Sequence, residues 1–242
     1  MKIILNGAGG QMGTVLRNLA ENTGNFTVVA NVDPYAQREG FYASLEAFTG
    51  EADCIFDFSN HACTQGLMAY AVARKLPVVV ATTGHTPEEL SCIREAAQTI
   101  PVFHSGNMSV GIALLVQLAR QTAAMFPDAD VEIIERHHNR KLDVPSGTAL
   151  MLAKAVQEAR PDSHLLVGRH ENGKRTKEEI GIHSLRMGNT VGVHEVIVNT
   201  GSQIITLKHE AQDRGLFAEG AVTAGRFLTG KQPGLYTMDD IV

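Results

Sequence analysis

The chain has 242 residues, 44% of them hydrophobic, and a formal net charge of -5 at pH 7. These values allow one large or two modest domains with hydrophobic cores, and the acidic balance argues against a dedicated nucleic-acid binder. The first apolar run is too short for a secretory segment and no apolar stretch approaches the roughly 20 residues of a membrane span, so we expect a cytoplasmic protein without membrane contacts.

The first half of the chain alternates short apolar runs with helical patterns. Continuous apolar strands separated by helices predict a parallel sheet covered on both faces, which binds ligands at the carboxyl ends of its strands. The predicted strands are residues 2–6, 26–32, 53–58, 77–81 and 102–104, and the predicted helices are residues 11–22, 61–75 and 87–99.

The second half has a different hydrophobic periodicity, in which strand patterns dominate. Alternation of apolar and polar residues predicts an open, mostly antiparallel sheet with one solvated face, so the whole chain is of the α/β class with a second, α+β region. A final helix is expected to pack back on the first region, and the polar stretch 168–179 is expected to be a flexible loop. The predicted strands are residues 131–135, 182–187, 193–199 and 203–209, and the predicted helices are residues 109–126, 147–159 and 215–228.

A glycine loop follows the first predicted strand and opens the first predicted helix. The run Gly7 to Gly13 fits the frame G-x-x-G-x-x-G, through Gly7, Gly10 and Gly13, better than G-x-G-x-x-G. In either frame a tight turn brings backbone N–H groups and a helix N-terminus close to a pyrophosphate. The loop therefore predicts dinucleotide binding, and the alternative is an ordinary glycine-rich turn.

Asp33 ends the second predicted strand, where a carboxylate can bind the adenosine ribose. Its charge would repel a 2′-phosphate and Pro34 follows it directly, which slightly favours NADH over NADPH, although Arg38 lies close enough in sequence to reach such a phosphate. The alternative is a turn aspartate before a proline. Two further loops, at residues 82–84 and 105–108, end later strands where the nicotinamide half of a cofactor would extend, although ordinary turns also suit them.

Positive and titratable side chains crowd into residues 136–141. Crowding of this kind is unfavourable unless an anion meets it, so a small dianionic substrate is expected here, just past the end of the strand at 131–135. Lys141 and His138 could hold substrate charge, and His137 could transfer a proton near neutral pH. A solvated basic loop remains the alternative.

Ser146 follows as a good helix N-cap. The N–H groups of Gly147 and Thr148 could then bind a carboxylate with help from the helix dipole. No metal is expected, because Glu132 and Glu135 stand at awkward spacing for a closed site with the two histidines. The three cysteines form no C-x-x-C pair and predict neither zinc nor a disulfide framework.

Four segments together resemble the 4-hydroxy-tetrahydrodipicolinate (dihydrodipicolinate) reductase family. They are G-A-G-G-Q-M-G at 7–13, A-T-T-G at 81–84, N-M-S-V-G at 107–111 and E-R-H-H-N-R-K-L-D-V-P-S-G-T at 135–148. The resemblance implies a cofactor domain at 1–107 completed by 213–242, and a substrate domain at 108–212 that builds a homotetramer. It also implies NAD(P)H-dependent reduction of a cyclic dicarboxylate imine in lysine biosynthesis.

The resemblance assigns roles residue by residue. His137 and Lys141 look like proton donors, and the substrate ligands look like His138, Ser146, Gly147 and Thr148. The family often has glycine at position 81 and phenylalanine at position 108, where this chain has alanine and methionine. The implied cofactor contacts are Gly7, Ala8, Gly9, Gly10, Gln11, Met12, Asp33, Ala81, Thr82, Thr83, Ser105, Gly106, Asn107 and Met108.

Two other functions remain open at this point. One is a different two-domain nicotinamide dehydrogenase. An aldehyde dehydrogenase that forms a thioester would need a cysteine at the domain junction, whereas Cys54, Cys63 and Cys92 all lie in the first half. The other is a non-catalytic NAD(H) sensor, which would have no need of His137 and Lys141.

Overall fold

The computed structural model describes residues 1–36 and 38–242, and these form two compact units. The first unit comprises Met1–Val110 and Arg214–Val242, and the second comprises Gly111–Asp213. The family resemblance places the boundaries at 107 and 213. Each unit has its own sheet and its own hydrophobic core.

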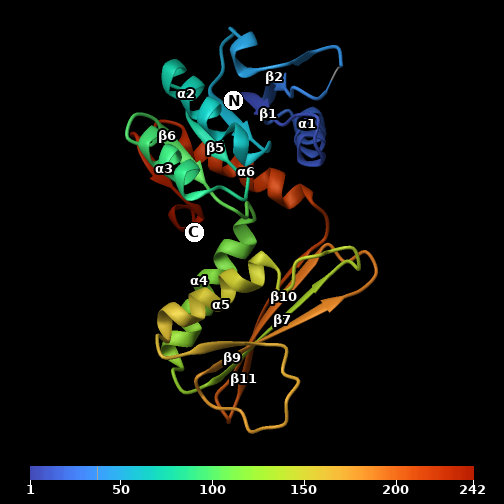
Figure 1. The fold of residues 1–242 in the computed structure, drawn as a ribbon, viewed down its shortest axis with the longest axis vertical. Coiled ribbons are helices and arrows are strands. Elements are labelled where there is room, and N and C mark those ends of the chain that lie inside the picture. Colours follow the sequence, from blue (N-terminus) through green and yellow to red (C-terminus); the bar gives the residue numbers. More distant parts are fainter. Residues whose placement is uncertain (37) are drawn as a thin grey trace. The chain divides into compact units, whose positions relative to one another are not determined.

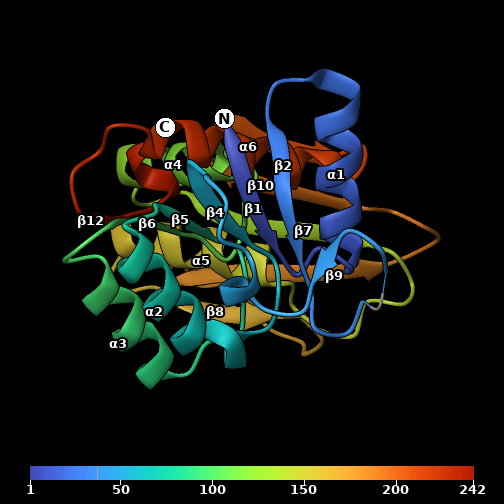
Figure 2. The same ribbon diagram turned by 90° about the horizontal axis from the view of Figure 1, so that it is seen from above.

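The first unit contains a seven-stranded sheet in which all pairings are parallel (Figures 1 and 2). The predicted parallel sheet is therefore confirmed. Two of its strands were not expected from the sequence, because stretches of two or three residues show no periodicity. In spatial order the strands are β12 (Gly234–Tyr236), β6 (Pro101–His104), β5 (Val78–Val80), β4 (Cys54–Asp57), β1 (Lys2–Asn6), β2 (Thr27–Val32) and β3 (Phe41–Tyr42).

Helices cover both faces of this sheet: α2 and α3 lie on one face, and α1 and α6 on the other (Figure 2). Helix α3 begins sharply, because Thr86 and Glu89 form a capping box and Pro87 takes the first helical position. The helices are α1 (Gln11–Thr23), α2 (Thr64–Arg74), α3 (Pro87–Ala96) and α6 (Gly215–Leu228), with short 3₁₀ turns η1 (Leu45–Ala47), η2 (His61–Cys63) and η3 (Met238–Asp240).

Strand order sets the position of the candidate site in the first unit. The chain runs from β1 outward through β2 and β3, and then returns to build β4, β5 and β6 on the other side of β1. This reversal is a topological switch point, where the loops after neighbouring strands diverge and leave a crevice. The loops that follow β1, β2, β4 and β5 all end at this edge.

The second unit contains a five-stranded sheet whose pairing is mixed rather than mostly antiparallel. β11, β10 and β7 pair antiparallel, whereas β7, β9 and β8 pair parallel. The parallel half arises because helix α5 carries the chain across the sheet after β7, as parallel neighbours require. In spatial order the strands are β11 (Ile204–Ala211), β10 (Gly192–Asn199), β7 (Asp130–His137), β9 (Glu179–Arg186) and β8 (His164–Val167), of which β8 was not predicted.

Two helices, α4 (Val110–Met125) and α5 (Gly147–Ala159), pack on one face of this sheet. Alternate strand residues such as Val131, Ile133 and Val196 point into that core and are fully buried. Their neighbours along each strand lie on the opposite face, which carries partly exposed polar and apolar side chains.

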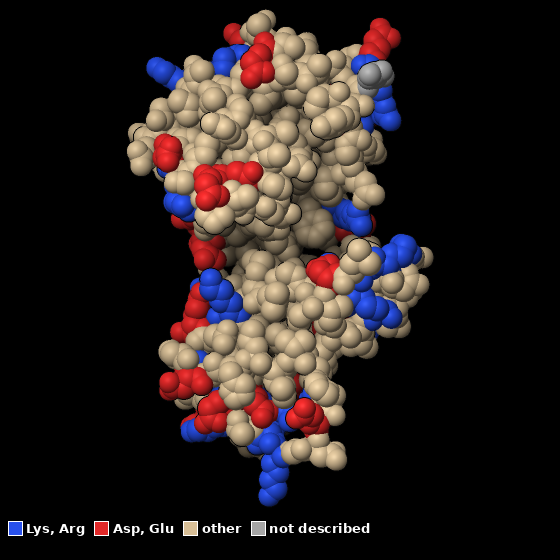
Figure 3. Space-filling view, in the orientation of Figure 1, with Lys and Arg blue, Asp and Glu red and all other residues tan. Residues whose placement is uncertain are grey.

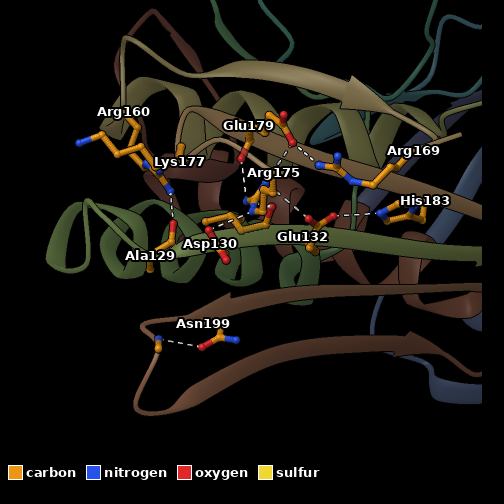
Figure 4. Close-up of polar contacts among 12 residues, drawn as sticks. Ala129, Asp130, Glu132, Arg160, Arg169, Arg175, Lys177, Glu179, His183 and Asn199 are labelled. Carbon is orange, nitrogen blue, oxygen red and sulfur yellow. Dashed lines mark hydrogen bonds and ion pairs between the residues drawn. The ribbon is translucent and has the colours of Figure 1, made fainter. Parts of the chain in front are cut away.

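The segment predicted as a flexible loop, between β8 and β9, has no regular structure but is tied to the sheet by Arg175 (Figure 4). The Arg175 guanidinium donates to the carbonyl oxygens of Val131, at 3.1 Å, and Glu179, at 2.8 Å. Its Nε lies 3.0 Å from a carboxylate oxygen of Asp130. Arg169 adds a second ion pair, to Glu179.

Glu132 extends across the sheet over the neighbouring strand at Gly181. A Cβ atom at position 181 would lie 1.7 Å from Glu132 Oε2, so a side chain there would displace the carboxylate. Glu132 instead accepts a hydrogen bond from His183, at 2.9 Å (Figure 4). The sheet face opposite the helices thus carries an ordered polar network.

Candidate active site

The glycine loop has the geometry expected of a phosphate-binding turn. Gly7 has φ +80°, and a Cβ there would lie 2.4 Å from the Phe58 carbonyl oxygen. A Cβ on Gly13 would lie 2.5 Å from the Ala8 carbonyl oxygen, so both end positions of the frame require glycine. Gly10 is the N-cap of α1, and its first turn has neither a side-chain cap nor an acidic residue. The helix N-terminus is therefore suited to an anion.

Asp33 lies beside this loop, as the sequence predicted from its position after β2. Its Oδ2 accepts a hydrogen bond from Gly9 N at 2.9 Å, and its Oδ1 accepts one from Tyr35 N at 2.9 Å. Each oxygen keeps a second lone pair, so the carboxylate can still accept ribose hydroxyls. The same contact makes Gly9 necessary, because a Cβ there would lie 2.7 Å from Oδ2.

A cavity of about 320 Å³ opens next to the loop. Five of the predicted cofactor contacts line this cavity. The segment that follows β4 also lines it, although it was not predicted from the sequence because it matches no motif. The cavity is lined by Gln11, Met12, Phe58, Ser59, Asn60, His61, Ala81, Thr82 and Thr83. Its size and polar lining fit the central part of a dinucleotide.

A buried carboxylate, that of Asp57, holds the floor of this cavity. Asp57 is 1% exposed and contacts Asn6 Nδ2 at 2.8 Å, Ser59 Oγ at 2.5 Å and Thr82 Oγ1 at 2.6 Å. Burial raises the pKa of Asp57, while these hydrogen bonds oppose that shift. The three contacts join the ends of β1, β4 and β5, so they fix the positions of two cavity-lining hydroxyls.

The loop at 105–108 is built mainly from its own hydrogen bonds. Ser105 Oγ donates to the Asn107 carbonyl at 2.7 Å, and the Asn107 side chain accepts from Ser109 N at 2.9 Å. The Met108 side chain is buried, with its carbonyl packed against α6 at Gly220. None of the four residues lines the cavity of the described structure, although Gly106 lies beside Thr83. Any cofactor contact of this loop would therefore come chiefly from its backbone.

In the second unit, His137 lies within β7 and not past its end, which corrects the sequence prediction. The strand is longer because its pairing with β9 continues to Arg186. His137 Nδ1 lies 2.5 Å from Glu135 Oε2, and the residue is 8% exposed. A Cβ on Gly192 would come within 3.1 Å of His137 Nε2, so glycine leaves room around that nitrogen.

Glu135 organises the surroundings of His137, a role that the sequence did not reveal. It is fully buried and accepts two hydrogen bonds from Arg186, at 2.8 and 2.9 Å. It also accepts one from Ser146 N at 3.2 Å. Burial opposes ionisation, but the hydrogen bonds from Arg186 and His137 overcome it and lower the pKa of Glu135 to about 2. The E-x-H spacing was an available signal, since residues two apart on a strand share a face.

Ser146 is the N-cap of α5, as predicted. Its Oγ accepts a hydrogen bond from Ala149 N at 3.2 Å and lies 3.2 Å from His194 Nε2. The Ser146 hydroxyl can both donate and accept, so the donor in this contact depends on the tautomer of His194. Burial and the neighbouring His137 lower the pKa of His194 to about 4, which agrees with a neutral ring. The first turn of α5, which includes Gly147 and Thr148, has no acidic residue.

The remaining basic side chains do not converge on one point. Arg136 lies on the opposite face of β7 from His137 and pairs with Glu195, while Arg140 donates to Asn189 at 2.9 Å. Lys141 Nζ lies 2.8 Å from Asp143 Oδ1, and this hydrogen bond lowers the pKa of Asp143. His138 is half-buried in the turn that leads to Lys141. The crowded charge is therefore partly balanced by the chain's own carboxylates.

Neither a metal site nor a membrane-spanning helix is found in the described part of the chain. Within residues 1–36 and 38–242, no group of three or more His, Cys, Asp or Glu side chains is placed to hold a metal ion. No helix among these residues is long and apolar enough to span a bilayer.

The fold of the first unit and the acid–base chemistry of the second are those of a nicotinamide-dependent oxidoreductase. The family described as "Dihydrodipicolinate reductase, N-terminus" matches residues 1–108, and the family described as "Dihydrodipicolinate reductase, C-terminus" matches residues 111–242. The chain belongs to the dihydrodipicolinate reductase family, and the resemblance inferred from its motifs is confirmed.

Known relatives span the whole chain. A 4-hydroxy-tetrahydrodipicolinate reductase of Caldanaerobacter subterraneus subsp. tengcongensis is 44% identical over 100% of this chain and 98% of its own length. Another, of Clostridium novyi, is 42% identical with the same coverage. A solved structure, dipicolinate-bound dihydrodipicolinate reductase from Paenisporosarcina sp. TG-14, has a TM-score of 0.86 and 25% identity, covering 100% of this chain and 99% of that one. These likenesses span both units and not the nucleotide-binding fold alone.

Proposed function

We propose that this protein reduces the cyclic dicarboxylate 4-hydroxy-tetrahydrodipicolinate to tetrahydrodipicolinate, a step of the diaminopimelate route to lysine. Its family and its relatives, which are 4-hydroxy-tetrahydrodipicolinate reductases, support the reaction. The observation that carries the mechanism is the hydrogen-bonded chain from Arg186 through Glu135 to His137, beside the N-terminus of α5.

Substrate binding is assigned to the N-terminus of α5 and the turn that precedes it. The N–H groups of Gly147 and Thr148 lie at the positive end of the helix, where a carboxylate is stabilised. Lys141 and His138 would hold the rest of the dianion. In the free protein Lys141 forms an ion pair with Asp143. In this scheme the substrate carboxylate replaces Asp143 as its partner, so the ammonium group is paired before and after binding.

Proton donation is assigned to His137 and Lys141. The nicotinamide, when bound, supplies the hydride. Since ionised Glu135 accepts from His137 Nδ1, the proton on that nitrogen is held and Nε2 is the nitrogen that exchanges protons with the substrate. A general acid in this position typically contributes about 10²–10⁴-fold in rate.

NADH is proposed as the slightly preferred cofactor. The N-terminal family match supports a nicotinamide nucleotide in general. The finer preference rests on Asp33, whose carboxylate lies beside the glycine loop and would repel a 2′-phosphate. Titration of the protein with NADH and with NADPH measures the preference directly. A lower dissociation constant for NADPH would contradict it.

A homotetramer in the cytoplasm is proposed for the assembly and its location. The face of the second unit's sheet that lies opposite α4 and α5 has no covering element within that unit, and it carries Ile134, Ile197 and Ile204 among its polar residues. Sedimentation equilibrium measures the assembly, and a monomer at micromolar concentration would contradict it. Fractionation of the source cells tests the location.

The decisive experiment follows the absorbance of the reduced nicotinamide while the substrate is generated enzymatically. The proposed function predicts oxidation of NAD(P)H that depends on that substrate. A non-catalytic sensor would bind the nucleotide without oxidising it, and it remains the second candidate only if this assay shows no turnover.

On the face shown in Figure 3, acidic and basic side chains are interspersed, in agreement with a small-molecule substrate rather than a polyanion.

A further inference from the structure

His61 is the titratable side chain among the described residues that line the cavity of the first unit. The other lining residues are neutral amides, hydroxyls and apolar groups. A dinucleotide carries an anionic pyrophosphate, which would meet the glycine loop at one side of this cavity. Among the lining side chains of the described residues, His61 is therefore the one that can carry a positive charge towards that anion.

Local structure fixes the place of His61 at the carboxyl edge of the sheet. It begins the 3₁₀ turn η2, the next element after β4, and this turn is capped by Asn60, whose side chain accepts from Ala62 N at 2.9 Å. In a doubly wound fold the adenosine half lies towards β2 and the nicotinamide half towards β4 and β5. His61 consequently lies on the side of the cavity where the pyrophosphate leads into the nicotinamide ribose.

Glu89 sets the orientation of the imidazole. His61 Nδ1 lies 3.0 Å from Glu89 Oε1 and 2.9 Å from Oε2, so this nitrogen donates to the carboxylate and Nε2 is the ring nitrogen that remains for a ligand. Glu89 is held in turn by the capping box of α3, in which its Oε2 accepts from Thr86 N at 2.7 Å. The hydrogen bonds from His61 and Thr86 lower the pKa of Glu89, so the partner carboxylate stays ionised.

We propose that protonated His61 is a contact for the phosphate–ribose part of the bound nucleotide, and that cofactor binding weakens as pH rises through neutrality. Protonated His61 and Glu89 together are neutral, and Nε2–H can donate to a phosphate oxygen. Deprotonation leaves a net negative pair facing an anion and turns Nε2 into an acceptor. The inference rests on nucleotide binding by the first unit and not on the identity of the substrate.

Other charged groups lie nearby and must be separated from His61 in the test. His85 precedes α3 and lies within electrostatic reach of Glu89. Asp57 lies under the cavity floor, and Arg214 pairs with Gln11 at the glycine loop. Of these, His85 is the other imidazole near Glu89, so it provides the matched control.

The test measures the dissociation constant of NADH by its fluorescence, without substrate, between about pH 6 and pH 8.5. NADH is used because it lacks the titrating 2′-phosphate of NADPH. In the wild-type protein the dissociation constant should rise roughly three- to tenfold across this range, the effect expected for the net contribution of one typical hydrogen bond. Constant affinity over the range would overturn the proposal.

Three variants sharpen the result. His61→Gln should bind NADH weakly at every pH in the range and lose the dependence. Glu89→Gln keeps the capping box but removes the charge, so its loss of affinity should occur at lower pH than in the wild type. His85→Gln should keep the wild-type profile. If the profile survives in His61→Gln, or disappears only in His85→Gln, the assignment of His61 is wrong. These measurements involve no turnover and stand even if the proposed substrate is incorrect.

Discussion

The first unit presents mainly backbone groups at its candidate site, whereas the second unit presents side chains gathered from several strands. In the first, glycines and a helix N-terminus shape the loop, and one buried carboxylate supports the cavity floor. In the second, Glu135 joins groups from β7, β9 and the start of α5. Substitutions should therefore act through shape in one unit and through charge in the other.

The largest expected effect is on turnover, from Lys141→Ala in the second unit. Loss of a proton donor and of a charge on the substrate should lower kcat roughly 10²–10⁴-fold, with the NADH dissociation constant nearly unchanged. Steady-state kinetics and NADH titration measure the two effects separately. Arg140→Ala is the matched control, since this exposed neighbour bonds to Asn189. A Lys141→Ala variant with full turnover would show that the residue is not a proton donor.

Shape in the first unit is tested by Gly13→Ala. The added Cβ would lie 2.5 Å from the Ala8 carbonyl oxygen, so the loop must shift. Overpacking of this kind costs about 1–3 kcal/mol, which predicts a rise of roughly five- to 150-fold in the NADH dissociation constant.

Gly66→Ala on α2 provides the control for this change. A Cβ at position 66 meets no atom within 4 Å, so NADH binding should be unaffected. Helix propensity alone should make this variant slightly more stable. Equal binding by the two variants would mean that the glycine loop does not contact the nucleotide.

The role of charge in the second unit is tested by comparing the free energy of unfolding of the Glu135→Gln variant with that of the wild type. Removing one partner of a buried ion pair should destabilise the protein by about 3 kcal/mol at pH 7. The pKa of Glu135 is lowered from 4.5 to about 2 in the folded protein, so its ionised form stabilises the fold above pH 4.5. That contribution is lost as pH falls towards 2.

The difference between wild type and Glu135→Gln, measured by urea unfolding, should therefore shrink from pH 5 to pH 2.5, a window set by the shifted pKa of Glu135. Glu195→Gln serves as the control, because its pair with Arg136 is partly exposed and should contribute less than about 1 kcal/mol. A difference that stays constant with pH would point to lost packing and not to lost charge.

The smallest effect is expected from Ser146→Ala. This change removes the N-cap hydrogen bond to Ala149 and the contact with His194, and should cost about 1 kcal/mol of stability. The substrate KM should rise with it, because the same helix end is assigned to the carboxylate. Ser91→Ala, within α3, should change neither quantity. If Ser146→Ala lowers stability but leaves KM unchanged, the carboxylate binds elsewhere.

Sequence reasoning predicted the parts of the molecule that depend on local pattern. The parallel sheet of the first unit is found as expected, and Ser146 is the N-cap of α5. In both cases the determinants are adjacent in the chain: apolar runs between helices, and a capping serine before an apolar helix. The family motifs are also local, since each consists of residues that are adjacent in the chain.

The remainder depended on pairing between distant segments. The end of β7 was placed too early, because its last two residues are polar and become strand through pairing with the distant strands β9 and β10. Arg186 and His194 belong to the candidate site through contacts that span about fifty residues, and no spacing rule predicts them. The mixed order of the second sheet is likewise decided by where α5 returns the chain, which periodicity does not encode.

The course of the chain has a consequence for biosynthesis on the ribosome. The second unit is one continuous segment, whereas the first needs α6 and β12, which follow the second unit in the chain. Until Gly215–Leu228 emerges, the sheet residues that α6 covers, such as Phe56 and Phe103, lack their packing against that helix. The first unit should thus be completed after the second, and a released chain truncated near residue 213 should be protease-resistant in its middle segment while its beginning is still digested.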